Sequence, residues 1–189
     1  MSGEPDTTAQ AVGGPDRVVT DEQRAYWAQL EAPMASCTAL ITDADGRILV
    51  VDPTYKDGFD MPGGMVEAGE TQIEGLEREL AEELDLTGVP IGRFLVLDQV
   101  PAARYGRAMV VTVFHVGPLT DQQTKSLRFA DGEIGAAEFL PVEEALARLP
   151  RRLARRIQAA HAALLAGVPA VLIDGKSHAL SGPAVSEAR

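Results

Sequence analysis

The chain has 189 residues, of which 46% are hydrophobic and 24% charged, a composition typical of one globular domain with a sizeable core. Its net charge of −11 argues against broad affinity for nucleic acid or anionic membranes, because both carry negative charge themselves. The single cysteine, Cys37, excludes an internal disulfide and fits a reducing cytoplasm. We therefore expect a soluble cytoplasmic protein.

The two ends of the chain differ in composition from its middle. Residues 1–18 are rich in Gly, Pro, Thr and Asp, so we expect a disordered tail there. Residues 19–175 are expected to form a single domain, followed by a flexible tail over 176–189. The first residues lack the basic and apolar regions of a signal peptide, so none is predicted.

A short helix is predicted near the start of the domain. Thr20 and Gln23 form the capping-box pattern, in which each side chain bonds the backbone of the other residue. Tyr26, Trp27 and Leu30 are expected to form the buried side of this helix, with Trp27 as a packing anchor.

A β-hairpin is predicted next. Residues 35–42 read as one strand and the apolar run 48–51 as another. Residues 43–46 contain Asp and Gly and predict the turn between them. Cys37 lies in the first strand, so a buried thiol is expected there and not a nucleophile.

The stretch from Gly63 to Leu86 combines a glycine-rich loop with an amphipathic helix. Glu79, Glu82 and Glu83 cluster on one edge of this helix. A divalent cation would offset their repulsion, and oxygen ligands suit Mg²⁺ or Mn²⁺. An ordinary solvated glutamate face is the alternative interpretation. The apolar stripe that predicts the helix, at spacings of three and four, is Ile73, Leu76, Leu80 and Leu84.

The loop before this helix favours the ligand-binding interpretation. Gly63, Gly64 and Gly69 permit backbone conformations that let a chain approach a ligand closely. Glu67 and Glu70 lie in the same loop and add carboxylates to it.

Loop and helix together resemble the Nudix box, the signature of the Nudix family. That pattern is Gly, five residues, Glu, seven residues, Arg-Glu, an aliphatic residue, any residue, Glu-Glu, any residue, Gly and an aliphatic residue. Asp85 stands in place of the last glycine. Because Asp tolerates the left-handed backbone better than most residues, Asp85 is expected to end the helix at a slightly higher energetic cost. The matching residues are Gly64, Glu70, Arg78, Glu79, Leu80, Glu82, Glu83 and Leu86.

The resemblance implies an α/β fold, an α/β/α sandwich with a mixed sheet, and a Mg²⁺-dependent hydrolase of a diphosphate linkage. Its small-molecule substrate would be ADP-ribose-like, a nucleotide sugar or a nucleoside triphosphate. Pro101 lies 15 residues after Leu86, where ADP-ribose hydrolases of the family tend to carry proline. Family members are often homodimers. A non-catalytic Nudix domain that senses a nucleotide or binds a partner is the alternative, and a diphosphate isomerase with a reactive cysteine is another.

The resemblance also implies roles for individual residues. Glu79, Glu82 and Glu83 would hold the metal, with the Gly64 carbonyl as a further oxygen donor, and Glu79 or Glu83 is a candidate general base. Arg78 stays protonated and is expected to orient carboxylates through forked hydrogen bonds. Glu70 is a possible partner for Arg78. The full set of residues expected to shape the box is Gly63, Gly64, Glu70, Leu80 and Leu86.

Two strands are predicted after the box, over 94–100 and 109–116. The loop that joins them carries cationic and aromatic side chains that suit a phosphate or a base, although an ordinary exposed turn is an equal alternative. An aromatic residue ahead of the box, where the family often has one, and a box-loop glutamate are further candidates. The full set of candidates for substrate binding is Phe59, Glu67, Arg104, Tyr105 and Arg107.

The remainder of the domain begins with a polar loop predicted over 119–132, long enough for a role as a lid or in specificity. Glu133 follows it, near the point where many Nudix relatives carry an acidic metal ligand or base, and is a candidate for either role. Four arginines, Arg151, Arg152, Arg155 and Arg156, are expected to form a solvated face. The remaining predicted elements are strands over 134–140 and 168–173 and helices over 142–149 and 151–165.

Overall fold

The computed structural model describes residues 18–129 and 132–178. It divides into two units, residues 1–32 and 33–189. Most of the two predicted tails, residues 1–17 and 179–189, lies outside the described residues. Among those that are described, no helix combines the length and apolar character needed to cross a membrane.

The first unit contains helix α1 (Asp21–Trp27). Its predicted capping box is present: the hydroxyl of Thr20 accepts the N–H of Gln23, and the Gln23 side chain accepts the N–H of Thr20. The predicted burial is wrong, because Tyr26, Trp27 and Leu30 are 60%, 50% and 53% exposed. None of residues 18–32, the described part of this unit, is buried, so they form no core that could cover these side chains.

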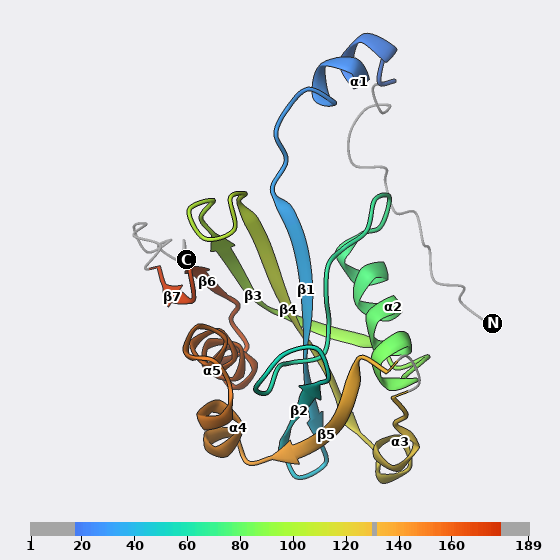
Figure 1. Cartoon of the computed structure of the whole chain (residues 1–189), viewed down its shortest axis with the longest axis vertical. Helices are drawn as coiled ribbons and strands as arrows, with labels where there is room; N and C mark the ends of the chain where they lie inside the picture. Colours follow the sequence, from blue (N-terminus) through green and yellow to red (C-terminus); the bar gives the residue numbers. More distant parts are fainter. Residues whose placement is uncertain (1–17, 130–131, 179–189) are drawn as a thin grey trace, which may run out of the picture. The chain divides into compact units, whose positions relative to one another are not determined.

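The second unit is built on a seven-stranded mixed sheet (Figure 1). Its strands are β1 (Met34–Asp43), β2 (Ile48–Pro53), β3 (Ile91–Val100), β4 (Met109–Leu119), β5 (Ile134–Leu140), β6 (Ala170–Ile173) and β7 (Lys176–Ser177). Their order across the sheet is β5-β2-β1-β4-β3-β6-β7. β1 runs parallel to β4 and β3 parallel to β6, while the other neighbouring pairs are antiparallel.

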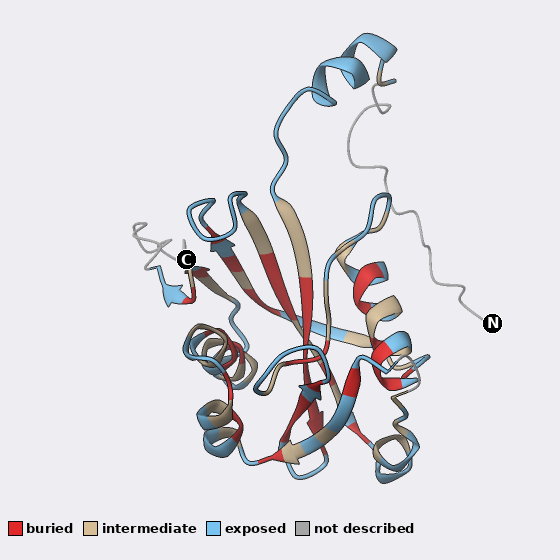
Figure 2. Cartoon of the chain, in the orientation of Figure 1, coloured by how far each residue is buried: buried red, intermediate tan, exposed pale blue. Residues whose placement is uncertain are grey.

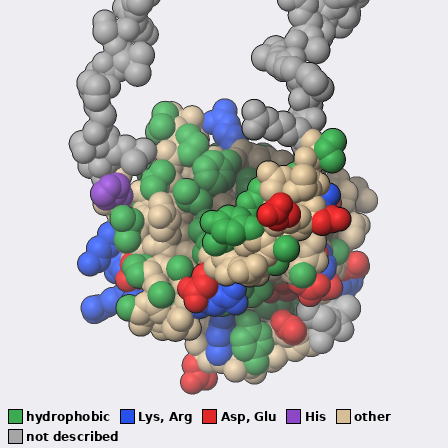
Figure 3. Space-filling view, turned by 90° about the horizontal axis from the view of Figure 1, so that it is seen from above, with side chains coloured by type: hydrophobic (Ala, Val, Ile, Leu, Met, Phe, Trp, Pro, Cys, Tyr) green, Lys and Arg blue, Asp and Glu red, His purple; other side chains and the backbone are tan. Residues whose placement is uncertain are grey.

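Helices cover both faces of this sheet, so the predicted α/β/α sandwich is confirmed (Figure 1). They are α2 (Gln72–Leu84), α3 (Asp121–Ser126), α4 (Val142–Arg148) and α5 (Arg151–Ala166). The side chains of α2 pack into one hydrophobic cluster, and those of α4 and α5 pack into a second one on the other face. In the space-filling view of Figure 3, acidic side chains lie scattered among basic and apolar ones.

Strand β1 lies inside the sheet, between β2 and β4, and is buried from Cys37 to Asp43 (Figure 2). Cys37, Ala39 and Ile41 belong to the cluster on the α2 face, whereas Leu40 belongs to the cluster on the α5 face. Both faces are covered, which explains why the strand is buried throughout and not on alternate residues. The expected burial of Cys37 is confirmed.

The six strands and three helices predicted beyond residue 33 are present, with ends that differ by up to three residues. The sequence reasoning missed β7, which falls in the predicted C-terminal tail, and α3, which falls in the predicted loop over 119–132. Thr120 and Gln123 form a capping box at the start of α3. The same Thr-x-x-Gln pattern that predicted α1 was therefore the available signal.

Two further expectations concern helix α2. Ile73 is 38% exposed, so it does not belong to the buried stripe, which consists of Leu76, Leu80 and Leu84. Asp85 adopts the left-handed conformation (φ 53°, ψ 29°) as the C-cap, as expected from the sequence.

The predicted solvated arginine face of α5 is wrong for Arg156. Its guanidinium is buried and donates from Nε (2.9 Å) and Nη2 (2.7 Å) to Oδ2 of Asp98, which is fully buried on β3. The N–H of Gly175 donates to the other oxygen, Oδ1, of Asp98 at 3.0 Å. This pair ties α5, β3 and the β6–β7 turn together, a contact that helical spacing alone does not reveal.

Removing the charge of Asp98 is expected to destabilise the fold strongly. Asp98→Asn leaves Arg156 buried without a counter-charge, which lowers the free energy of unfolding by about 3–5 kcal/mol. The matched control, Glu138→Gln, breaks the exposed pair with Arg148 and should cost less than about 1 kcal/mol. Urea unfolding measures both changes in the free energy of unfolding. Equal changes in the two variants would show that the buried pair contributes no more to stability than the exposed pair.

Replacing Asp85 by glycine is expected to raise the free energy of unfolding by about 1 kcal/mol. Glycine adopts φ 53° without strain, and the change removes a negative charge from the C-terminal end of a helix. Asp85→Ala is the control, since it removes the charge and increases the backbone strain, and it should be the less stable of the two. A glycine variant less stable than the parent would mean that the Asp85 side chain contributes more than its strain costs.

Candidate functional site

The glutamates of helix α2 face the loop that precedes the helix. A capping box fixes the residue at which the helix starts, and buried leucines fix the side that packs on the sheet. Thr71 is its N-cap: the Thr71 hydroxyl accepts the N–H of Glu74 at 3.2 Å, and the Thr71 N–H donates to the Glu74 carboxylate at 2.7 Å. The buried leucines hold one side of the helix against β1. The edge that carries Glu79 and Glu83 therefore faces Gly63 and Gly64.

The loop before α2 runs along β1 like an added strand. The N–H groups of Cys37 and Ala39 donate to the carbonyls of Gly64 and Pro62, both at 2.9 Å, and Val66 donates back to Ala35 at 3.0 Å. β2 pairs with β1 only at the far end, between Thr42 and Ile48. The loop thus occupies the edge of β1 that β2 leaves open.

Two consecutive glycines permit this close approach. Gly63 has a φ of +123°, and a Cβ there would lie 2.3 Å from the carbonyl oxygen of Cys37. A Cβ at Gly64 would lie 2.4 Å from Oε1 of Glu79. The N–H of Gly63 also donates to Oε2 of Glu83 at 2.9 Å. The backbone of β1 therefore requires glycine at position 63, whereas a side chain at position 64 would displace the carboxylate of Glu79.

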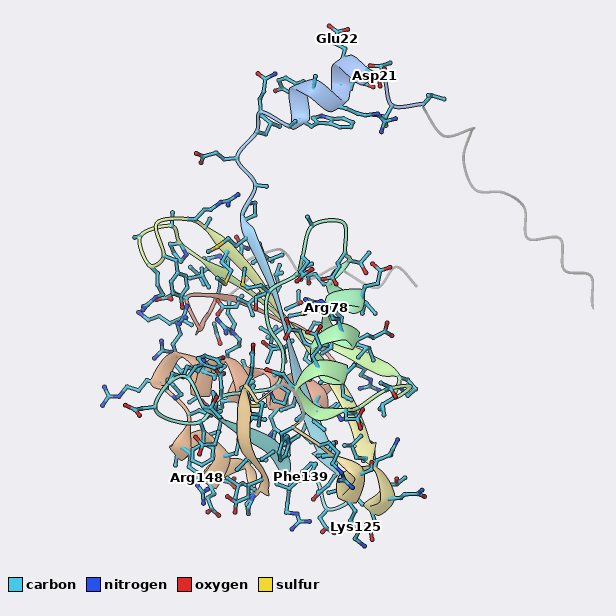
Figure 4. All side chains as sticks on the ribbon, turned by 45° about the vertical axis from the view of Figure 1, so that its right-hand side comes forward. Asp21, Glu22, Arg78, Lys125, Phe139 and Arg148 are labelled. Atoms are coloured by element: carbon cyan, nitrogen blue, oxygen red, sulfur yellow. The ribbon has the colours of Figure 1, made fainter. Side chains whose placement is uncertain are left out.

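Arg78 is the centre of the site and is labelled in Figure 4. Its Nε and Nη2 donate to the two oxygens of Glu70, at 2.9 and 3.3 Å, which is the forked pair expected from the sequence. Its Nη1 donates to Glu79 and to Glu82, both at 3.0 Å, and Nη2 donates to the Met65 carbonyl at 2.9 Å. One guanidinium therefore orients three carboxylates and anchors the loop.

The carboxylates around Arg78 have different environments. Burial raises the pKa of Glu79, and the charges of Glu82 and Glu133 raise it further, although Arg78 acts in the opposite direction. Hydrogen bonds from Arg78 and from the Glu67 N–H lower the pKa of Glu70. The Glu82 side chain is 55% exposed, whereas Glu83 is buried. Burial and the neighbouring carboxylates thus both disfavour the charged form of Glu79, and a nearby cation would offset that cost.

The donor chemistry of this site fits a divalent cation. Arg78 bonds Glu70, Glu79 and Glu82, and a fourth carboxylate, that of Glu83, accepts the N–H of Gly63. All of these donors are oxygens, which Mg²⁺ and Mn²⁺ prefer. No group of three or more His, Cys, Asp or Glu side chains is arranged to hold a metal ion within residues 18–129 and 132–178. In this structure Arg78 supplies the positive charge for two of the three predicted ligands.

The other predicted site residues are dispersed around the domain. The Glu133 carbonyl accepts the N–H of Thr54 at 2.8 Å, and its carboxylate is near enough to Glu79 to raise the pKa of that group. Glu67 is exposed, and its N–H donates to Glu70 at 2.9 Å. Phe59 packs against the core on the α5 face, with the guanidinium of Arg148 5.2 Å from its ring centre.

The predicted substrate loop lies between β3 and β4. Arg104 donates to both carboxylate oxygens of Asp174 at 3.1 Å, and Arg107 lies in the same loop. Tyr105 lines a cavity of about 310 Å³ that Gly63 also lines. Sequence reasoning missed Lys56 and Asp60 in this cavity, since its walls come from segments far apart in the chain and share no spacing pattern.

Comparison with known proteins points to one family. A family model described as the NUDIX domain matches residues 32–162. The MutT protein from Methanosarcina mazei Go1 is 21% identical, with a TM-score of 0.58 over 74% of this chain and 99% of its own. The E. coli ORF135 protein is 28% identical, with a TM-score of 0.54 over 69% and 91%. The NUDIX domain of Shewanella oneidensis NrtR, complexed with ADP ribose, is 17% identical, with a TM-score of 0.59 over 77% and 99%. The comparison with curated proteins gave no match.

Substitution of the two glycines is expected to separate folding from metal binding. Gly63→Ala should lower the free energy of unfolding by about 2–4 kcal/mol, because its Cβ meets backbone and its φ is strained. Gly64→Ala should change it by less than about 1 kcal/mol, since only the end of the Glu79 side chain must move. The same variant should weaken Mn²⁺ binding by about 10-fold or more.

Urea unfolding and Mn²⁺ titration followed by electron paramagnetic resonance measure the two effects. Gly88→Ala serves as a control for a positive-φ glycine with open space around it. Unchanged Mn²⁺ affinity in Gly64→Ala would show that the Glu79 carboxylate is not a metal ligand.

Proposed function

This chain belongs to the Nudix family, as the box between Gly64 and Leu86 indicated, and from that premise we propose that it is a Mg²⁺-dependent pyrophosphohydrolase. It cleaves a diphosphate linkage in a nucleoside diphosphate joined to another moiety. The observation that carries the proposal is the network around Arg78, which orients Glu70, Glu79 and Glu82 against a loop of two glycines.

The chemical problem is the delivery of water to a phosphorus surrounded by negative oxygens. Glu79, Glu82 and Glu83 would hold Mg²⁺, with the Gly64 carbonyl as a further donor. That carbonyl also accepts the Cys37 N–H at 2.9 Å and the Cys37 thiol at 3.7 Å. Bound Mg²⁺ would screen the phosphate oxygens and orient the attacking water. Arg78 keeps the carboxylates in place, and Mn²⁺ has the same ligand preference.

A carboxylate of this chain accepts the proton of the attacking water. Three carboxylates are candidates for this role. Glu79 lies against Gly64, Glu83 is held by the Gly63 N–H, and Glu133 approaches Glu79 from the start of β5. The first two lie in the box and the third outside it, so replacing each in turn by glutamine identifies the base.

ADP-ribose is the substrate that we propose to test first. Pro101 follows Val100 at the end of β3, at the position where ADP-ribose hydrolases of the family tend to carry proline. The NrtR domain, which has a similar fold, is complexed with ADP ribose. Nucleoside triphosphates are the next substrates to test, and nucleotide sugars follow them.

A nucleotide-sensing Nudix domain without catalysis is the second candidate. One observation favours it: Glu79 and Glu82, two of the three proposed metal ligands, are paired with Arg78. Asp85 gives it no support, since this residue closes α2 in the left-handed conformation that the family glycine would adopt.

A diphosphate isomerase receives no support from the cysteine. Cys37 is fully buried in β1, and burial raises the pKa of its thiol to about 11. A thiolate is therefore scarce near neutral pH, and the residue has the environment of a structural cysteine.

Hydrolysis of a panel of ADP-ribose, nucleotide sugars and nucleoside triphosphates, with products identified by chromatography, tests the proposal. Glu82→Gln is expected to lower kcat by about 100-fold with folding preserved, because it removes a metal ligand. Glu77→Gln on the same helix is the matched control, since Glu77 is exposed and outside the Nudix pattern. Tight binding of one nucleotide without turnover by the parent protein would favour the sensor.

A further inference from the structure

A cavity on the α5 face of the sheet adjoins the Nudix box. Its volume is about 310 Å³, and its lining includes Ser36, Thr38, Lys56, Gly63, Tyr105 and Arg152. Ser36 and Thr38 alternate along β1 with Cys37, which packs on the α2 face. Gly63 connects cavity and box, since it lines the first and donates its N–H to Glu83 in the second. A molecule bound at the box therefore has a cavity next to it.

Tyr105 supplies the aromatic wall of this cavity, and Arg152 holds it. The guanidinium of Arg152, on the first turn of α5, lies 5.3 Å from the centre of the Tyr105 ring. Nη2 of the same arginine also donates to the tyrosine hydroxyl. The Tyr105 residue remains 49% exposed, so the Arg152 guanidinium orients the ring and leaves about half of the residue uncovered.

Asp174 joins this arginine to the loop that carries Tyr105. Its two carboxylate oxygens accept from Nε and Nη2 of Arg104, both at 3.1 Å, and Oδ1 accepts from Nη1 of Arg152 at 3.5 Å. Arg104 is the residue before Tyr105. One carboxylate therefore orients the tyrosine from two sides, through its neighbour in the loop and through the cation on its ring.

The turn that carries Asp174 is itself held firmly. Its neighbour Gly175 donates its N–H to the buried carboxylate of Asp98 at 3.0 Å, and the Gly175 carbonyl accepts Nε of Arg155 at 3.1 Å. Asp174 has a φ of 51°, which asparagine also tolerates. Asparagine at this position thus removes the charge without a change in backbone preference.

We propose that Asp174 is a positioning residue, which holds Tyr105 through Arg104 and Arg152 as the wall of a nucleobase-binding cavity beside Gly63. The assignment rests on the proposed function, which supplies the nucleoside diphosphate. An oriented, half-exposed aromatic ring is the surface on which a base stacks. The hydroxyls of Ser36 and Thr38 line the same cavity and offer hydrogen bonds to a base or its sugar.

The test measures binding, so it does not depend on catalysis. Calorimetric titration of the full chain without added metal compares AMP, GMP, CMP and UMP with ribose 5-phosphate, which lacks a base. At least one nucleotide is expected to bind more tightly than ribose 5-phosphate, by about 10-fold or more, because stacking of a base on an aromatic residue contributes an effect of that size. Tyr105→Ala should abolish that preference, and Tyr105→Phe should keep it because the ring remains.

Asp174→Asn is expected to reduce the preference for a base by about 3-fold or more while the affinity for ribose 5-phosphate stays the same. A merely structural role would weaken both ligands together. Glu144→Gln, which removes an exposed carboxylate paired with Arg148, is the matched control and should retain the preference. Equal binding of all nucleotides and ribose 5-phosphate, or a full preference in Asp174→Asn, would overturn the proposal.

Hydrolysis measured in parallel separates this proposal from the proposed function. If the protein hydrolyses none of the substrates but shows a base preference that depends on Tyr105 and Asp174, the nucleobase-binding cavity is supported and the hydrolase activity is rejected. If the protein hydrolyses ADP-ribose and Tyr105→Ala and Asp174→Asn leave the KM unchanged, the hydrolase activity is supported and the nucleobase-binding cavity is rejected.

Discussion

The close approach of the loop at Gly63 and Gly64 to both β1 and α2 is the constraint on which the site depends. Side chains at these positions would meet the Cys37 carbonyl and the Glu79 carboxylate. Because the loop pairs with β1 along the edge that β2 leaves open, it brings backbone groups next to the glutamates of a helix packed on the same strand. The position of the box carboxylates is thus a consequence of how the sheet is built.

Arginines pair with carboxylates at three places in this domain, and each pairing has a different effect. Arg78 bonds carboxylates that α2 and its loop gather at the box, which lowers their mutual repulsion. Arg156 compensates Asp98 in the interior, where a lone charge is costly. Arg152 and Arg104 share Asp174 at the surface and orient Tyr105. In each of these three places an arginine fixes the orientation of a carboxylate or of an aromatic ring.

Local sequence patterns predicted most of the elements because helix and strand periods and capping boxes depend on neighbours in the chain. The same reasoning was wrong where a residue's surroundings come from elsewhere. Trp27 and Ile73 follow apolar patterns but are exposed, and Arg156 looks like part of a solvated face but is buried. Helix α3 has a capping signal that the polar composition of its segment concealed.

The sequence by itself determined the Nudix box, because its fixed spacing places glycines, an arginine and glutamates on one loop and one helix. It also determined six of the seven strands of the described sheet and the left-handed end of α2 at Asp85. Only the tertiary structure decided how Arg78 distributes its bonds, and that Tyr105 and Asp174 meet Arg152 beside Gly63. Asp174 lies 70 residues from Arg104, and contacts at such separations are set by the pairing of strands and the packing of helices, which no local spacing encodes.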